Sequence, residues 1–310
     1  MPGRELPQLQ QLFLTDGGLE TDLIFNQGVD LPCFASIVLL RDATGTKRLA
    51  DYYRRYFDIA RQARTGFILE SATWRASEDW AIPLGLTLDE LDGLNRRAVA
   101  LLLELRGEWA DAGLPIVVSG CHGPRGDGYD PGHVMTAAEA RAYHARQAAA
   151  LVEAGADMLS AMTMTNTPEA IGLTEAARDV GAPVAVSFTL ETDGRLPTGE
   201  TLAGAIRAVE DATSGYPAYY MVNCAHTSHY EAVLDNGAEW TRRVRGLRSN
   251  ASRSSHAELN VMTTLDDGDP AEFGRDHARL RAAYPSLTVL GGCCGTDHRH
   301  VAAIAASLNE

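Results

Sequence analysis

Eight short β-rich runs, separated by longer helical patterns, constrain the fold of this chain more than any other feature. The runs lie near residues 12–16, 67–71, 115–120, 157–162, 183–189, 219–224, 246–250 and 287–292, with seven helical stretches expected between them. Several joints from helix to strand carry a glycine that can end the helix in a left-handed conformation, at Gly113, Gly155 and Gly181. This order predicts a single-domain (β/α)8 TIM barrel over residues 1–310, with a doubly wound open sheet as the alternative.

The composition argues against nucleic acids and membranes as binding partners. The chain has 310 residues, 45% of them hydrophobic, and a formal net charge of -14, which repels nucleic acid and anionic membranes. Residues 1–5 lack the basic start of a secretory signal, and no apolar run is long enough to cross a bilayer. We therefore expect a cytoplasmic protein with small-molecule partners, no nucleic acid and no membrane. The oligomeric state stays open, a homo-oligomer included.

Three of the five cysteines follow expected strands directly. Cys224 comes after the apolar run 219–222, and Cys293 and Cys294 come after the run 287–290. In a barrel, the ends of the sixth and eighth strands lie at the same mouth, so the three thiolates can meet and hold Zn²⁺ with one position open, as in a catalytic site. The chain is too large to need disulfides, so we expect reduced thiols. The alternatives for the adjacent pair are two small buried side chains or a vicinal disulfide, and Cys33 and Cys121 read as buried thiols.

The residues that follow the strands carry a family likeness. The motifs are TDGGLET at 15–21, SGCHGP at 119–124, SFT at 187–189, VNC at 222–224 and GGCCGT at 291–296. On these motifs the chain resembles, over nearly its whole length, the homocysteine S-methyltransferases, the zinc-dependent group that includes betaine-homocysteine methyltransferase. The resemblance implies an enzyme of methionine biosynthesis that moves a methyl group from a sulfonium or quaternary-ammonium donor to a thiol. It also implies that Cys224, Cys293 and Cys294 bind the catalytic Zn²⁺ and that the acceptor thiol takes the fourth position.

Further residues near the strand ends are candidates for substrate contacts. Aromatic faces suit a cationic donor, acidic groups can assist them, and arginine suits an anion. The aromatic candidates are Phe25, Trp74 and Tyr129, the acidic ones are Asp16, Glu20 and Asp22, the arginines are Arg75 and Arg253, and the other expected pocket residues are His122, Met162, Thr163 and Asn223.

Two positions depart from the family pattern. Met162 stands where family members usually have a glutamate that helps to hold the amino group of homocysteine, and a thioether cannot pair with an ammonium. Arg75 stands where the betaine enzyme has an aromatic residue. These departures predict an acceptor that is homocysteine or another small thiol, and a donor other than betaine.

Three other functions remain open on the sequence. A zinc hydrolase would activate water at the open metal position, with His122, His226 or Glu70 as base. The glycines after the last strands would suit a phosphate-binding isomerase, and the cysteines would suit a zinc-binding or redox-sensing protein. His226 and His229, at the start of an expected sixth helix, more readily cap that helix or line the site than bind metal, and Glu70 either lies buried in the mouth or pairs with Arg75.

Overall fold

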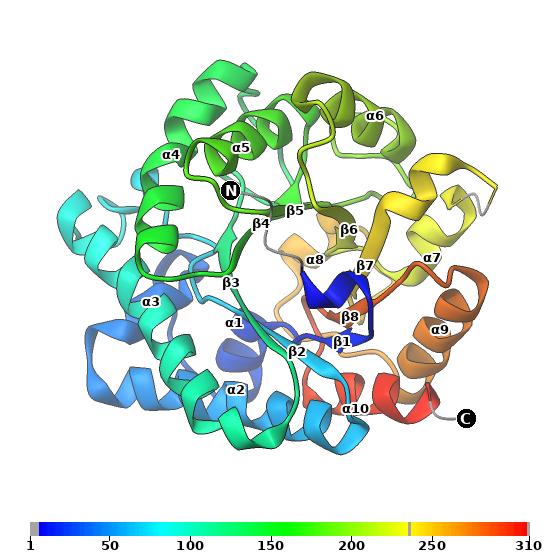
Figure 1. Cartoon of the computed structure of the whole chain (residues 1–310), viewed down its shortest axis with the longest axis horizontal. Helices are drawn as coiled ribbons and strands as arrows, with labels where there is room; N and C mark the ends of the chain where they lie inside the picture. Colours follow the sequence, from blue (N-terminus) through cyan, green and yellow to red (C-terminus); the bar gives the residue numbers. More distant parts are fainter. Residues whose placement is uncertain (1–5, 235–236, 309–310) are drawn as a thin grey trace.

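The computed structural model describes residues 6–234 and 237–308. Within these residues, eight parallel strands close into a barrel in sequence order, and helices surround it (Figure 1). The ring closes where β1 pairs with β8, through Phe13 with Val289 and Leu14 with Leu290. The strands are β1 Phe13–Leu14, β2 Gly66–Glu70, β3 Ile116–His122, β4 Met158–Met164, β5 Val184–Phe188, β6 Tyr219–Asn223, β7 Val244–Ser249 and β8 Val289–Gly292. The predicted TIM barrel is confirmed, and the open sheet is excluded.

The helices follow the strands with one departure from expectation. The α-helices are α1 Leu19–Thr21, α2 Ala43–Ala63, α3 Leu88–Glu108, α4 Ala137–Glu153, α5 Thr167–Asp179, α6 Leu202–Thr213, α7 Thr227–Tyr230, α8 His256–Val261, α9 Pro270–Ala283 and α10 His298–Ser307. The expected sixth helix is wrong as a full-length element. Over the described residues between β6 and β7, the chain forms the short α7 and two 3₁₀ turns, Glu231–Val233 and Glu239–Arg243.

Helix boundaries follow local chemistry. Thr87 caps α3 in a capping box with Glu90, as the sequence predicts. The glycines Gly113, Gly155 and Gly181 have φ values of 69°, 105° and 69°, so each turns the chain toward the next strand in a conformation that side chains rarely adopt. Among the described residues, no helix has the length and apolar character needed to cross a membrane. Residues 1–5, on which the expectation about a signal segment depends, lie outside the described residues.

Side-chain alternation along the strands separates an inner from an outer core. Ile68 and Val117 belong to a cluster inside the barrel with Met158 and Met162. Their chain neighbours Leu69 and Val118 belong instead to the larger cluster between the strands and the helices. Successive residues of a strand face opposite sides, so the residue after an inner apolar position points outward. This alternation decides which side chains at the strand ends reach the mouth of the barrel.

Candidate active site

A cavity of about 380 Å³ lies at the carboxyl ends of the strands. Its lining includes most of the residues expected from the sequence: Asp16, Glu20, Phe25, Trp74, Arg75, Tyr129, Met162, Thr163, Asn223, Cys224, Cys293 and Cys294. Catalytic groups of TIM barrels gather at this end, because the loops after the strands converge there. The cavity is therefore the candidate active site.

Three cysteine sulfurs converge in this cavity. Cys224 follows β6 directly, and Cys293 and Cys294 follow β8. The three Sγ atoms lie within 4.8 Å of one another. The Cys224 and Cys294 sulfurs are 3.9 Å apart. Backbone bonds from β7 fix both strand ends, because the Cys224 N–H donates to the Arg248 carbonyl at 3.1 Å and the Cys293 N–H donates to the Ser249 carbonyl at 2.8 Å.

The structure pairs the Cys224 and Cys293 sulfurs, while Cys33, Cys121 and Cys294 are free. The physical reason for the pairing is the convergence itself, because the ends of β6 and β8 bring these two sulfurs within bonding reach. The expectation that the thiols are reduced stays a prediction. The chemistry of the donor set fits a thiophilic metal when the thiols are reduced. Sulfurs around tetrahedral zinc, with Zn–S near 2.3 Å, lie roughly 3.8 Å apart, close to the Cys224–Cys294 spacing.

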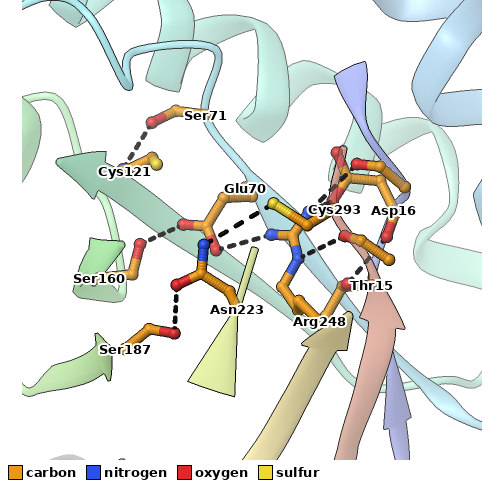
Figure 2. Close-up of polar contacts among 12 residues, drawn as sticks. Thr15, Asp16, Glu70, Ser71, Cys121, Ser160, Ser187, Asn223, Arg248 and Cys293 are labelled. Carbon is orange, nitrogen blue, oxygen red and sulfur yellow. Dashed lines mark hydrogen bonds and ion pairs between the residues drawn. The ribbon is translucent and has the colours of Figure 1, made fainter. Parts of the chain in front are cut away.

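Asn223 supports the cysteines from β6. Its side-chain oxygen accepts from the Thr163 N–H at 2.9 Å and from the Ser187 hydroxyl at 2.6 Å. Its amide nitrogen donates to the Thr163 hydroxyl at 2.8 Å. The same nitrogen lies 3.7 Å from the Cys293 sulfur (Figure 2). Thr163 has a φ of 62° at a bulge in β4, an uncommon backbone conformation that the Asn223 bonds hold.

A buried charge network at the floor of the cavity was missed by sequence reasoning. Arg248, on β7, donates to an Asp16 carboxylate oxygen at 2.5 Å and lies 3.5 Å from a Glu70 carboxylate oxygen. It also donates to the carbonyls of Gly292 at 3.1 Å and Gly17 at 3.3 Å. The available signal was a charged residue inside the otherwise uncharged segment Gly246–Ser249. The alternative pairing of Glu70 with Arg75 is wrong, because Arg248 occupies that role.

Burial and charge oppose each other in this network. Burial raises the pKa of Asp16 and of Glu70, although the Arg248 guanidinium acts to lower both. For Arg248, burial alone would lower the pKa, but the two carboxylates hold it above its ordinary range. One guanidinium therefore serves two buried carboxylates, and the charge at the floor is not balanced.

Comparisons with known proteins identify the family. The sequence profile described as homocysteine S-methyltransferase matches residues 13–308. The chain belongs to this family. It is 22% identical to homocysteine S-methyltransferase 1 of Arabidopsis thaliana over 316 aligned residues, which cover 96% of this chain and 93% of that protein. It is 27% identical to homocysteine S-methyltransferase 4 of Zea mays over 324 aligned residues, which cover 96% and 89%.

Solved structures of a family member show the same fold. The homocysteine methyltransferase MmuM from Escherichia coli in its metallated form superposes with a TM-score of 0.75 at 22% identity, over 96% of both chains. Its oxidized form superposes with a TM-score of 0.74 at 24% identity, over 97% of both chains. The homocysteine S-methyltransferase barrel is thus shared over nearly the whole chain.

Arg75 lies over Trp74, one of the three aromatic rings that the sequence predicts as contacts of a cationic donor. Its guanidinium carbon lies 5.9 Å from the ring centroid of Phe34, 5.1 Å from that of Trp74 and 4.5 Å from that of Trp80. Arg75 also donates to the Cys33 carbonyl at 2.7 Å and pairs with Asp127 at 3.1 Å. Burial lowers the pKa of Arg75, although the Asp127 carboxylate acts to raise it.

The segment after β7 forms a roof over the cavity. Leu259 and Asn260 of α8, with Met262, line it from above. His256, which sequence reasoning did not single out, anchors this roof. Its Nε2 lies 2.8 Å from the Cys224 carbonyl oxygen, and its ring stacks on Tyr129 with centroids 3.9 Å apart. The roof is thereby tied to the backbone of a cysteine in the cluster.

Several candidates lie outside the cavity lining. His122 is fully buried beside His144 on the outward side of β3, because Cys121 takes the inward position, and burial lowers its pKa to about 3. Its expected place in the pocket is therefore wrong. Asp22 and Arg253 also fall outside the lining, and Arg253 pairs with Glu272 at 2.6 Å.

The remaining polar candidates have structural partners. His226 caps α7 by accepting from the Ser228 N–H, which is one of the two roles predicted for it, a helix cap or a residue lining the site. Glu20, inside the lining, accepts from the Ser36 hydroxyl at 2.7 Å, and burial raises its pKa. Burial also raises the pKa of the Cys294 thiol, and the Glu20 carboxylate adds to that effect. Glu20 and Cys294 therefore repel each other when both are ionised.

Proposed function

We propose that this protein is a zinc-dependent S-methyltransferase that moves a methyl group from a sulfonium or quaternary-ammonium donor to a small thiol, homocysteine or a close relative, in methionine biosynthesis. The observation that carries the proposal is the convergence of Cys224, Cys293 and Cys294 in the cavity at the mouth of the barrel. Family membership supports the reaction class, and the sulfur-only donor set supports zinc.

The three reduced cysteines would hold the metal. When bound, zinc supplies a Lewis acid that favours the deprotonated form of an acceptor thiol, whose free pKa is near ~8.5. In the transfer, a bond forms between the acceptor sulfur and the methyl carbon as the bond from that carbon to the donor breaks. The donor leaves as a neutral thioether or tertiary amine, so no general base acts on the donor.

The chain's own residues position the reactants and exclude water. Asn223 fixes the Thr163 bulge and contacts the Cys293 sulfur, which keeps the cluster in register with β4. Leu259 and Met262 of the roof add apolar side chains to the cavity lining. In-line placement of donor and acceptor in a water-poor site is the main source of rate in a displacement at carbon.

The position of Arg75 argues against the Trp74 ring as a contact of the cationic donor. Since its guanidinium covers the Trp74 face, a cationic donor cannot use that face without meeting a like charge. We propose that Arg75 contacts a carboxylate on a substrate, and that Phe25 and Tyr129, which also line the cavity, lie nearer the onium group.

Hydrolysis receives less support. Of the bases considered for it, His122 lies behind β3 and His226 is absent from the cavity lining over the described residues. Of the three, only Glu70 belongs to the cavity lining. Three thiolate ligands also make a metal-bound water a weaker acid than three histidines would.

The test combines metal content with a transfer assay. Reduced protein is analysed for zinc and then mixed with pairs of small thiols and onium donors, before and after chelation. The proposal expects close to one zinc per chain and methylated thiol that disappears on chelation and returns with zinc. Zinc without transfer to any thiol would favour a metal-binding or sensing role, and transfer that survives full metal removal would overturn the zinc dependence.

A further inference from the structure

The carboxylate of Glu70 faces the floor of the cavity. Glu70 ends β2, two residues after Ile68, so it points to the inside of the barrel, as Ile68 does. Its side chain is 8% exposed, and it belongs to the cavity lining. Figure 2 shows it between Ser160 and the Arg248 guanidinium. A buried carboxylate that meets a cavity is a candidate to bind a ligand carrying the opposite charge.

The partners of Glu70 leave it incompletely satisfied. Asp16 takes the short bond from Arg248, at 2.5 Å, and its other oxygen accepts from the Tyr52 hydroxyl at 3.2 Å. Glu70 receives the Ser160 hydroxyl on one oxygen at 2.5 Å and also interacts with the Ser119 side chain. Its second oxygen lies 3.5 Å from Arg248, at the outer limit of a hydrogen bond. When both carboxylates are ionised, they and the one guanidinium sum to one negative charge, and the second Glu70 oxygen is the one with the more distant partner.

The position of the Glu70 carboxylate is set by its bond to Ser160 of β4. Ser160 and Met162 are two residues apart on the same face of that strand, and Met162, which is 4% exposed, lines the cavity. Through its bond to Ser160, Glu70 therefore presents its charge one step below Met162. The wall above the carboxylate is a thioether, which cannot compete for the same cation.

We propose that Glu70 binds the primary ammonium group of the acceptor, in place of the family glutamate that Met162 replaces. The proposal rests on the transfer function given above. An ammonium has N–H groups that can reach a carboxylate oxygen, and its charge neutralises the floor. The onium centre of a methyl donor has no N–H to donate and suits aromatic faces instead, so the acceptor is the better match for Glu70.

The test compares an aminothiol with the same molecule lacking the amino group. Reduced, zinc-loaded protein is assayed with homocysteine and with 4-mercaptobutyrate at a fixed donor, in wild type, in Glu70→Gln and in Glu210→Gln. Glu210 is the matched control, because it is a partly buried carboxylate that pairs with Arg243 away from the cavity. Binding of each thiol without donor is measured by calorimetry, and thermal melting checks the fold.

We expect wild type and Glu210→Gln to prefer homocysteine in kcat/KM and in binding. Glu70→Gln should lower the homocysteine values by roughly 10- to 100-fold, the effect of losing one charge-assisted hydrogen bond, and leave 4-mercaptobutyrate within about twofold. Equal losses of kcat/KM and binding for both thiols in Glu70→Gln would overturn the proposal. A wild-type protein that does not distinguish the two thiols would also overturn it, and this comparison needs no variant. Should no thiol be methylated, the binding comparison still reports on Glu70, so its failure is separate from failure of the transfer function.

The ammonium could also be supplied by the donor. Donors with and without a primary amino group are therefore compared at fixed homocysteine. The loss of kcat/KM in Glu70→Gln could depend on the amino group of the donor and not on that of the acceptor. That result would contradict the assignment of Glu70 to the acceptor.

Discussion

Replacing Arg248 by methionine should destabilise the protein through the two carboxylates that remain. In wild type, Arg248 is 7% exposed and contacts Asp16 and Glu70, as well as two backbone carbonyls. Removing one partner of a buried ion pair costs about 3–5 kcal/mol, because an uncompensated charge stays in the interior. We expect a loss of this size in the free energy of unfolding at pH 7.5.

The loss should shrink as the pH falls. Burial already raises the pKa of Asp16 and Glu70 above their ordinary values of 3.8 and 4.5, and Arg248 is the strongest group opposing that rise. Without Arg248 each pKa rises further, so the folded variant binds protons that the unfolded chain releases. A raised folded-state pKa stabilises the folded state at low pH, and the contribution is lost as the pH rises through that pKa. One extra proton bound by the folded variant changes the free energy by at most about 1.4 kcal/mol per pH unit, so the loss should be smaller at pH 5.5 than at pH 7.5.

Urea unfolding, followed by tryptophan fluorescence on reduced and metal-stripped protein, measures both quantities. The matched control is Arg54→Met, because Arg54 forms an exposed pair with Glu108 whose removal should cost less than about 1 kcal/mol at either pH. A loss in Arg248→Met below about 1 kcal/mol, or one of equal size at both pH values, would refute the reasoning about the buried network.

Three further perturbations address the cavity. Cys294→Ser should abolish stoichiometric zinc binding and methyl transfer, whereas the control Cys33→Ser should retain both. Elemental analysis and the transfer assay measure these effects, and an unchanged zinc content in Cys294→Ser would argue against the three-cysteine ligand set. Arg75→Gln should raise the KM of a carboxylate-bearing substrate roughly 10-fold with little change in kcat, and a change confined to kcat would contradict a binding role. A Cβ at Gly18 would collide with the Cys293 carbonyl oxygen, so Gly18→Ala should weaken zinc binding in a folded protein, which competition with a chelator can measure.

The barrel was predictable because its determinants are local. Each strand is a short buried run, and the joints at Gly113, Gly155 and Gly181 carry residues that end helices. The segment after β6 was not predictable in the same way. His226 begins a stretch rich in histidine, threonine and serine, which favour caps and turns as readily as helices, and the structure forms only four α-helical residues there within the described chain.

The site was predictable only in part, because side-chain direction depends on register. His122 and Cys121 are neighbours in one strand end, and a shift of one residue decides which of them meets the cavity. The partner of Glu70 was unpredictable for another reason. Arg248 lies 178 positions away in the sequence, and only closure of the barrel brings β2 and β7 to a common interior.

The floor network also links substrate recognition to the geometry of the cysteines. Arg248 donates to the Gly292 carbonyl, and the next residue, Cys293, donates its own N–H to the Ser249 carbonyl beside Arg248. A change at Arg248 therefore alters both the charge of the floor and the position of a cysteine. Glu70→Gln leaves these backbone bonds in place and changes the charge alone. A selective effect of Glu70→Gln on aminothiols, beside a general effect of Arg248→Met on zinc binding, is the pattern that this arrangement requires.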